Sequence, residues 1–187
     1  MLQKIKLFYW LCVTQTFFRF VYDSIGFKTI VCAPLSLRGK GINLGKNVRI
    51  AHMTRLETFN YYNGKRYCPR LTIGDNTSIE QCCHIAAVGN LQIGCNSVIS
   101  SFVFIEDHEH SLEDLHLKTH LLKRPLVLKN VKIGRNVFIG SGAKILAGSQ
   151  IGDRCVVGAN AVVKGIFPND CIIAGVPAKI IRQFEIK

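Results

Sequence analysis

The cysteines of this 187-residue chain lack the spacing of a disulfide framework or of a structural zinc site. The sequence contains eight cysteines but no C-x-x-C pair. Closely paired cysteines are typical of zinc-binding modules, and a regular cysteine framework is typical of small secreted domains. We therefore expect reduced thiols and a cytoplasmic protein, because disulfides rarely persist in the cytosol.

The sequence also lacks an apolar run long enough to cross a membrane. A strongly apolar stretch runs from Leu7 to Phe18 and ends at Arg19, short of the roughly 20 residues that a spanning helix needs. No small-residue cleavage site follows closely, which argues against a secretory signal. Two interpretations stay open: a helix packed over one end of the domain, which we favour, or a helix lying on the inner face of the membrane with its aromatic residues inserted.

Acidic residues are scarce, with 12 Asp and Glu against 24 Lys and Arg and a net charge of +12. In the first fifty residues the lone acid is Asp23. A basic end indicates an anionic partner, such as a membrane surface or a phosphorylated ligand. A nucleic-acid partner is not expected, because the basic residues show no interleaved stacking pattern of a known module.

A six-residue repeat is the strongest feature that is present. Aliphatic residues recur every six positions at Ile133, Ile139, Ile145, Ile151, Val157 and Val163. A small residue follows most of them four positions later, at Val137, Ala143, Ser149, Cys155 and Ala161. A helix has a period of about 3.6 residues, and a hairpin sandwich turns every 8–12 residues or so, so neither explains this spacing. Stacked turns around one core explain it.

Grouping the repeat in threes gives coils of about 18 residues. Five coils are predicted, beginning at Leu44, Ile73, Ile93, Ile133 and Ile151. Segments such as Gly74-Asp75-Asn76 suit the corners, because these residue types tolerate a left-handed backbone. We predict an all-β solenoid over residues 41–165. Because open ends expose strand edges, residues 1–40 are expected to form a helical cap, and residues 166–187 a turn and a short capping helix.

Two insertions interrupt the repeat. The first, at residues 57–72, is rich in aromatic side chains that can stack on a sugar ring: Phe59, Tyr61, Tyr62 and Tyr67. The second, at residues 106–132, contains four of the six histidines: His108, His110, His116 and His120. Insertions in a solenoid form loops, often on the functional face. We therefore expect the chemistry at the second insertion and acceptor recognition at both.

The repeat, the segment Ile105 to His110 and the tail Ala174 to Lys179 resemble the left-handed β-helix, hexapeptide-repeat acyltransferases. The resemblance covers about residues 40–184 and is greatest to the sugar O-acetyltransferases of surface polysaccharide and lipopolysaccharide synthesis. It implies a left-handed parallel β-helix, acetyl-CoA as co-substrate, no metal, and a homotrimer with sites shared between subunits.

The resemblance implies that His108 is the catalytic base, and the Asp-His-x-His pattern makes His110 the second candidate. A sugar hydroxyl needs a base to take its proton, and histidine suits that task near neutral pH. A carboxylate that fixes the imidazole tautomer could be Asp107, Glu109 or Asp114, and the sequence does not choose among them. No serine or cysteine motif indicates an acyl-enzyme, so direct transfer is expected.

The same resemblance implies donor contacts along the later coils. Ser141 matches a position at the pantetheine arm or thioester, and Gly158 with Ala159 matches a backbone stretch further along that arm. Cations suited to the nucleotide phosphates are Lys164, Lys179 and Arg182. Two departures from the family pattern, Phe138 and the segment Lys164-Gly165-Ile166, indicate that nucleotide contacts differ in detail.

The same sequence features bear on other functions. The same histidine and groove suit an N-acyltransferase acting on an amino sugar nucleotide, or an antibiotic acetyltransferase. A zinc hydratase on this scaffold needs histidines projecting from adjacent strands, and His84 is the lone histidine predicted on a strand of coils two to five. A non-enzymatic assembly scaffold is disfavoured by the intact tail and by His108.

Overall fold

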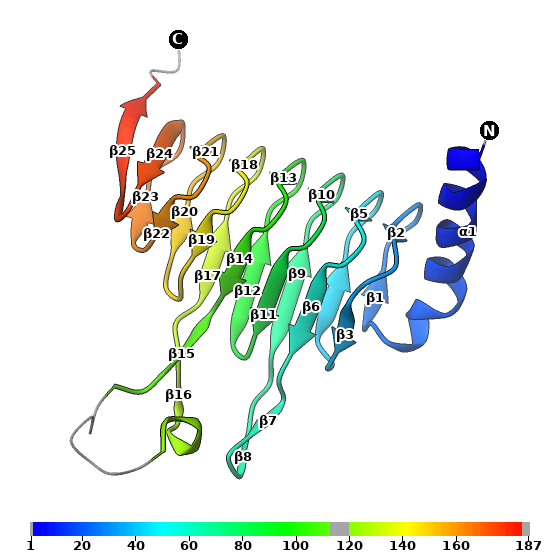
Figure 1. Cartoon of the computed structure of the whole chain (residues 1–187), viewed down its shortest axis with the longest axis horizontal. Helices are drawn as coiled ribbons and strands as arrows, with labels where there is room; N and C mark the ends of the chain where they lie inside the picture. Colours follow the sequence, from blue (N-terminus) through cyan, green and yellow to red (C-terminus); the bar gives the residue numbers. More distant parts are fainter. Residues whose placement is uncertain (1, 113–119, 185–187) are drawn as a thin grey trace.

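The computed structural model describes residues 2–112 and 120–184 and shows a left-handed β-helix with an α-helix at its N-terminal end (Figure 1). The predicted fold class is confirmed. Three parallel sheets form the sides of the solenoid, and each coil of the chain adds one strand to each sheet.

The strands of the three sheets are short. Sheet A contains β1 (Ser24–Ile25), β4 (Ile42–Leu44), β9 (Arg70–Ile73), β12 (Asn90–Ile93), β17 (Val131–Ile133), β20 (Gln150–Ile151) and β23 (Ile166–Phe167). Sheet B contains β2 (Ile30–Val31), β5 (Arg49–Ile50), β10 (Ser78–Ile79), β13 (Val98–Ile99), β18 (Phe138–Ile139), β21 (Val156–Val157), β24 (Cys171–Gly175) and β25 (Ala178–Gln183). Sheet C contains β3 (Ser36–Arg38), β6 (Arg55–Thr58), β11 (His84–Ala87), β14 (Phe104–Glu106), β19 (Lys144–Ile145) and β22 (Val162–Val163).

The core is a set of in-register aliphatic rows that run along the solenoid. In sheet B, Ile79 pairs with Ile50 on one side and with Ile99 on the other, and all three side chains are fully buried. The small residues of the repeat, such as Cys83 and Ala143, are buried beside these rows. Apolar burial at roughly 25 cal/mol per Å² therefore accumulates between coils and not within a single strand.

The corners use the residues that the sequence predicted. Asn76, Asn96 and Asn136 have φ values of 55°, 57° and 55°, in the left-handed region. Two of these side chains are also hydrogen-bonded between coils, since Asn76 Nδ2 donates to Asn96 Oδ1 at 3.2 Å. Asparagine tolerates this backbone conformation, so each coil turns at the same point.

The N-terminal segment contains more β-structure than predicted. Helix α1 (Leu2–Thr16) and the 3₁₀ turn η1 (Phe18–Phe20) pack over the first coil, but strands β1 to β3 form that coil within residues 24–38. The described residues therefore build six complete coils and a partial seventh, one more complete coil than predicted. The connection from this coil to the next is one residue longer than the repeat requires. The connection contains Gly39 and Gly41, whose φ values of 98° and 88° are readily adopted by glycine. Among the described residues, no helix is both long and apolar enough to cross a bilayer.

The predicted C-terminal capping helix is wrong over the described residues. The tail forms β24 and β25, which pair antiparallel around Val176-Pro177. Adjacent β-branched residues at Ile180 and Ile181 favour a strand, and pairing leaves β24 without an open edge. The last coil is thus covered by a strand of the same sheet.

Both insertions leave the solenoid at the edge of sheet C. The first carries a hairpin of β7 (Tyr61–Tyr62) and β8 (Lys65–Arg66). The second begins and ends in an antiparallel pair, β15 (His108–His110) with β16 (Leu126–Leu128), and contains the 3₁₀ turn η2 (Leu121–Lys123). The two insertions lie on the same side of the molecule (Figure 1).

Replacing Ile73 with alanine tests the stacked core. Ile73 is fully buried in β9, whereas the neighbouring Thr72 faces outward and is partly exposed. We expect Ile73→Ala to lower the free energy of unfolding by about 2–5 kcal/mol, because it leaves a cavity between coils. Thr72→Ala is the matched control and should cost less than about 1 kcal/mol. Urea unfolding followed by circular dichroism measures both, and equal losses would contradict the stacked-core description.

Candidate active site

Asp107 is anchored at the point where the second insertion leaves β14. Its side chain is fully buried, and its carboxylate accepts the backbone N–H of Val88 at 2.8 Å and of Gly89 at 2.9 Å. A Cβ at Gly89 would lie 3.3 Å from Asp107 Oδ2, so the absence of a side chain there permits the close approach. A buried carboxylate with two N–H donors is held in a fixed orientation.

His108 lies directly against this carboxylate. Its Nδ1 is 3.2 Å from Asp107 Oδ1, and its side chain is 13% exposed. An ionised carboxylate only accepts hydrogen bonds, so a hydrogen bond to Asp107 requires the proton of the neutral ring to be on Nδ1 and leaves the lone pair on Nε2. The Lys129 N–H donates to the Asp107 carbonyl at 2.8 Å, which closes the base of the insertion. The arrangement is a histidine with one nitrogen oriented and the other able to accept a proton.

Glu109, the other candidate carboxylate within the described residues, has different partners. Glu109 forms ion pairs with Lys129 and, at 3.6 Å, with Lys164. The Lys129 contact is the main reason that the pKa of Glu109 lies below its ordinary value. Asp114 and His116 lie outside the described residues. Of the two candidate carboxylates within the described residues, Asp107 is the one that contacts the imidazole of His108.

His110, at the other end of β15, has different surroundings. Its ring centroid lies 5.8 Å from that of Tyr62, and its Nδ1 is buried without a hydrogen-bond partner among the described residues. The more distant His120 is exposed, and its Nδ1 accepts the Leu122 N–H at 3.3 Å. Among the described residues, neither histidine has the carboxylate contact seen at His108.

The first insertion packs against the second, which the sequence did not predict. Tyr62 donates its hydroxyl to the Leu122 carbonyl at 2.5 Å, and Asn63 Nδ2 donates to the same carbonyl at 2.7 Å. Phe59 places its ring 6.3 Å from that of His108. Two of the predicted aromatic residues, Phe59 and Tyr62, therefore border β15, the strand that carries His108 and His110 and is named the histidine strand.

A second polar group on sheet C was also missed. Glu57 is 4% exposed, and its carboxylate lies 3.1 Å from Arg55 Nη2 and 3.6 Å from His84 Nε2. Burial lowers the pKa of His84, and the nearby charges of Arg55 and His108 lower it further, although Glu57 opposes this. Arg55 and Glu57 alternate with buried Leu56 in β6, and His84 precedes buried Ile85 in β11. This period-two alternation was the signal available in the sequence, because it places these polar residues on the outer face of the sheet.

The residues named for the donor fall into three groups. Ser141 and Ala159 occupy one corner of adjacent coils, where the Asn160 N–H donates to the Ser141 carbonyl at 2.9 Å. Both residues are exposed, and their own N–H groups have no acceptor among the described residues, whereas the Gly158 N–H donates to the Ile173 carbonyl of the next coil at 2.8 Å. Lys164 approaches Glu109 on the histidine strand instead.

Lys179 and Arg182 form the third group, on the outer strand β25. Both are exposed, and the guanidinium of Arg182 lies 4.9 Å from the centroid of the Phe184 ring. Within the described residues, no contact joins these two cations to Lys164. The structure therefore does not bring the three predicted phosphate contacts together in one chain.

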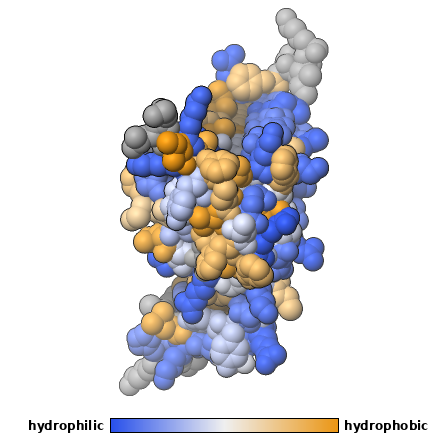
Figure 2. Space-filling view, turned by 90° about the vertical axis from the view of Figure 1, so that its right-hand side faces the viewer, coloured by the Kyte–Doolittle hydropathy of each residue, from blue (hydrophilic) through white to orange (hydrophobic). Residues whose placement is uncertain are grey.

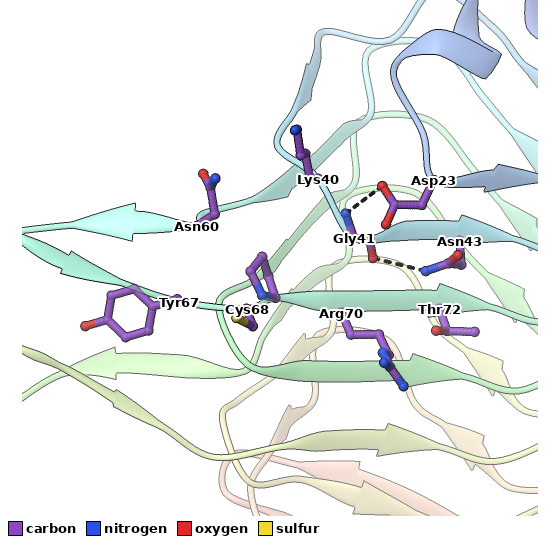
Figure 3. Close-up of a pocket in the computed structure, with 10 residues that line it drawn as sticks. Asp23, Lys40, Gly41, Asn43, Asn60, Tyr67, Cys68, Arg70 and Thr72 are labelled. Carbon is purple, nitrogen blue, oxygen red and sulfur yellow. Dashed lines mark hydrogen bonds between the residues drawn. The ribbon is translucent and has the colours of Figure 1, made fainter.

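A pocket of about 710 Å³ lies at the N-terminal coils, and Figure 3 shows the residues that line it. Lys40, Asn43 and Arg70 line it, and Asp23 accepts the Gly41 N–H at 3.1 Å at its rim. Asn60 and Tyr67 of the first insertion also line the pocket, whereas Asp107 and His108 do not. The first insertion thus divides its residues between this pocket and the histidine strand.

Comparison with known proteins assigns the chain to a family. A model described as bacterial transferase hexapeptide (six repeats) matches residues 130–165. WbbJ of Escherichia coli strain K12, named as a lipopolysaccharide biosynthesis O-acetyl transferase, is 34% identical over 164 residues, which span 83% of this chain and 79% of WbbJ. The chain belongs to the hexapeptide-repeat transferase family. WcaF of the same strain, named as a colanic acid biosynthesis acetyltransferase, is 28% identical and covers 79% of this chain and 72% of WcaF.

Solved structures share the hexapeptide-repeat fold. A mutant of AntD, an N-acyltransferase from Bacillus cereus in complex with dTDP and coenzyme A, superposes with a TM-score of 0.72 at 20% identity, covering 91% of this chain and 89% of AntD. Galactoside acetyltransferase in complex with coenzyme A superposes with a TM-score of 0.60 at 22% identity. The match covers 96% of this chain and 78% of that protein. The structural likeness shows the fold, and family membership makes this chain an acetyltransferase, as the sequence predicted.

Glu106, next to Asp107, provides a test of the burial at this site. Burial raises the pKa of its carboxyl above the ordinary 4.5; the His108 charge lowers it, and the Asp107 charge adds to the increase. Between the pKa of Glu106 in the unfolded chain and its higher pKa in the folded protein, the folded state holds a proton that the unfolded chain has lost. The free energy of unfolding therefore falls as the pH rises through this range. We expect Glu106→Gln to raise the thermal midpoint at pH 8, with the gain vanishing below about pH 4. Calorimetry across this range measures it, and a gain independent of pH would exclude the buried charge as its cause.

Proposed function

We propose that this enzyme transfers an acetyl group from acetyl-CoA to a hydroxyl of a sugar in a surface polysaccharide or lipopolysaccharide, with His108 as the general base. The observation that carries the proposal is the contact between Asp107 and His108 at 3.2 Å, which leaves Nε2 of His108 able to accept a proton. The names of WbbJ and WcaF, which concern lipopolysaccharide and colanic acid, support an acceptor of this class.

The chemistry follows from the orientation of the imidazole. Acetyl-CoA supplies an activated carbonyl as a thioester. His108 Nε2 takes the proton of the sugar hydroxyl while the oxygen forms a bond to that carbonyl carbon. The carbon–sulfur bond then breaks, and the same nitrogen returns the proton to the leaving thiolate. Asp107 acts as a positioning residue, because it fixes the tautomer and stabilises the imidazolium that forms between the two steps.

The free N–H groups at one corner of the later coils suit the donor. Ser141 and Ala159 lie on adjacent coils and are exposed, and a Cβ at Gly140 would lie 2.6 Å from Ala159 N. The two coils are therefore closely stacked at this corner, and their N–H groups match the amide carbonyls of a pantetheine arm. Lys179 and Arg182 add cations for the nucleotide phosphates. Lys164 stays a predicted contact of the nucleotide phosphates.

A homotrimer completes this arrangement in our proposal. The outer face of sheet B carries an in-register apolar row of Val98, Phe138 and Val156, exposed by 39%, 44% and 37%. Outward-facing apolar residues in a row favour association with another copy. A groove between two copies would bring the donor corner of one subunit to the His108 of another, because sheet C separates these two sites within one chain.

Replacing His108 tests the assignment of the base. We expect His108→Ala to lower acetyl-CoA turnover with the acceptor by about 10²- to 10⁴-fold, the usual contribution of a general base. Release of the coenzyme A thiol measures turnover, and the thermal midpoint checks that the fold persists. His52→Ala, at an exposed histidine of an earlier coil, is the matched control and should leave turnover unchanged.

The outcome also separates the alternatives. A collapse in His110→Ala with turnover retained in His108→Ala would move the base to the second histidine. The acceptor is found by screening sugars, amino sugar nucleotides and antibiotics for thiol release. Turnover with an amino sugar nucleotide and none with a hydroxyl acceptor would indicate N-acyl transfer in place of O-acetyl transfer. AntD, which is named as an N-acyltransferase, has the same fold.

A charge placed in the apolar row tests the trimer. We expect wild-type protein to have three times the 20.9 kDa chain mass by light scattering. Phe138→Lys should reduce the mass to that of one chain and lower turnover, because a buried unpaired charge is strongly disfavoured. Gln92→Lys, on the outer face of sheet A, is the control. A wild-type mass of one chain would contradict the shared site.

A further inference from the structure

Helix α1 is fixed to the first coil by polar contacts on one face. Thr14 is fully buried, and its hydroxyl accepts the Val31 N–H at 2.8 Å. The amide of Gln15 donates to the carbonyls of Gly26 and Thr29, both at 3.1 Å. These contacts set the rotation of the helix about its axis, so one defined face is turned away from the solenoid.

That outward face is apolar, although helices on protein surfaces are usually polar there. Figure 2, which views the molecule from the α1 end, shows a central band of apolar side chains flanked by hydrophilic ones. We call this surface the α1 face. It contains Ile5, Phe8 and Tyr9 of the helix, exposed by 60%, 67% and 58%, and three residues of the segment that follows the helix, Phe17 65%, Phe20 91% and Phe27 70%. A contiguous patch of this kind marks a binding surface.

Cations border the α1 face. Lys4 and Lys6 lie about 100° to either side of Ile5 on the helix, at the two flanks of the apolar stripe. Beyond the helix, Arg19 and Lys28 are exposed next to Phe20 and Phe27. The first 22 residues contain no Asp or Glu. An apolar centre with lysines on both flanks is typical of a helix lying in a membrane interface, because the ammonium groups reach the headgroups.

We propose that the α1 face docks on the surface of an anionic lipid bilayer. Charge complementarity selects this occupant. A second copy would oppose Lys4, Lys6 and Arg19 with identical cations, whereas anionic headgroups attract each of them. The insertion is in the plane of the membrane, since α1 is too short to cross it. The proposal does not depend on acetyl transfer, but it would hold the enzyme where lipid-linked sugars lie.

Vesicle co-sedimentation of the full chain tests the proposal. We expect sedimentation with vesicles that contain phosphatidylglycerol and little with pure phosphatidylcholine, and about tenfold weaker binding at high salt. Phe8→Ser combined with Phe20→Ser should weaken binding by about tenfold or more, since it removes inserted apolar area. Lys4→Gln combined with Lys6→Gln should weaken binding to anionic vesicles alone.

Ile166→Ser is the matched control, because Ile166 is 75% exposed on β23, at the other end of the solenoid. Its vesicle binding should equal that of the wild type. Absence of binding to anionic vesicles by the folded wild-type protein would overturn the proposal. Equal binding by the Phe8/Phe20 variant would do the same. A fall in oligomeric mass in that variant, without a change in vesicle binding, would assign the face to a second copy.

Discussion

Stacking of inward aliphatic side chains from coil to coil is the constraint on which the rest of this structure depends. Many strands of sheets B and C contain two residues, too few to bury an apolar face alone. Ile79 is buried because Ile50 and Ile99 lie above and below it in register. A shift of one residue would turn the aliphatic outward, so the register has to recover after every insertion.

This requirement explains the shape of the candidate active site. The chain leaves the solenoid after Glu106 and must return at Val131, in register with Leu91. The departing and returning segments are therefore held side by side, and they pair as β15 and β16. Asp107 lies at this junction, where the free N–H groups of the coil below, at Val88 and Gly89, hold its carboxylate. The scaffold thus orients the carboxylate, and the carboxylate orients the histidine.

The regular part of the fold could be predicted from the sequence because period and corner chemistry are local. The first coil was not predicted, although Ile25 and Val31 keep the six-residue spacing of the repeat. One additional residue near Gly39 to Gly41 separates this coil from the next and interrupts the period. The tail was expected to be a helix, but its strand is decided by the unpaired edge of β24, which depends on the completed solenoid.

The site could be predicted only in part. The family resemblance, and not a local pattern, indicated His108, and its role as the base stays a prediction. Asp107 and Glu109 both flank His108 in the sequence, so the structure was needed to show that Asp107 is the one of these two that contacts the imidazole. The contact of Phe59 with His108 joins two insertions far apart in the chain, and no local pattern encodes it. The same holds for the paired Glu57 and His84, which alternation places outward but does not bring together.

The tautomer of His108 tests the central claim most directly. Nitrogen-15 NMR of uniformly labelled protein at mildly alkaline pH distinguishes a protonated ring nitrogen from a bare one, and His108→Gln assigns the resonances by their loss. The account predicts a proton on Nδ1, held by Asp107, and a bare Nε2. A proton on Nε2 with a bare Nδ1 would contradict it, because the nitrogen that faces the acceptor could then take no proton.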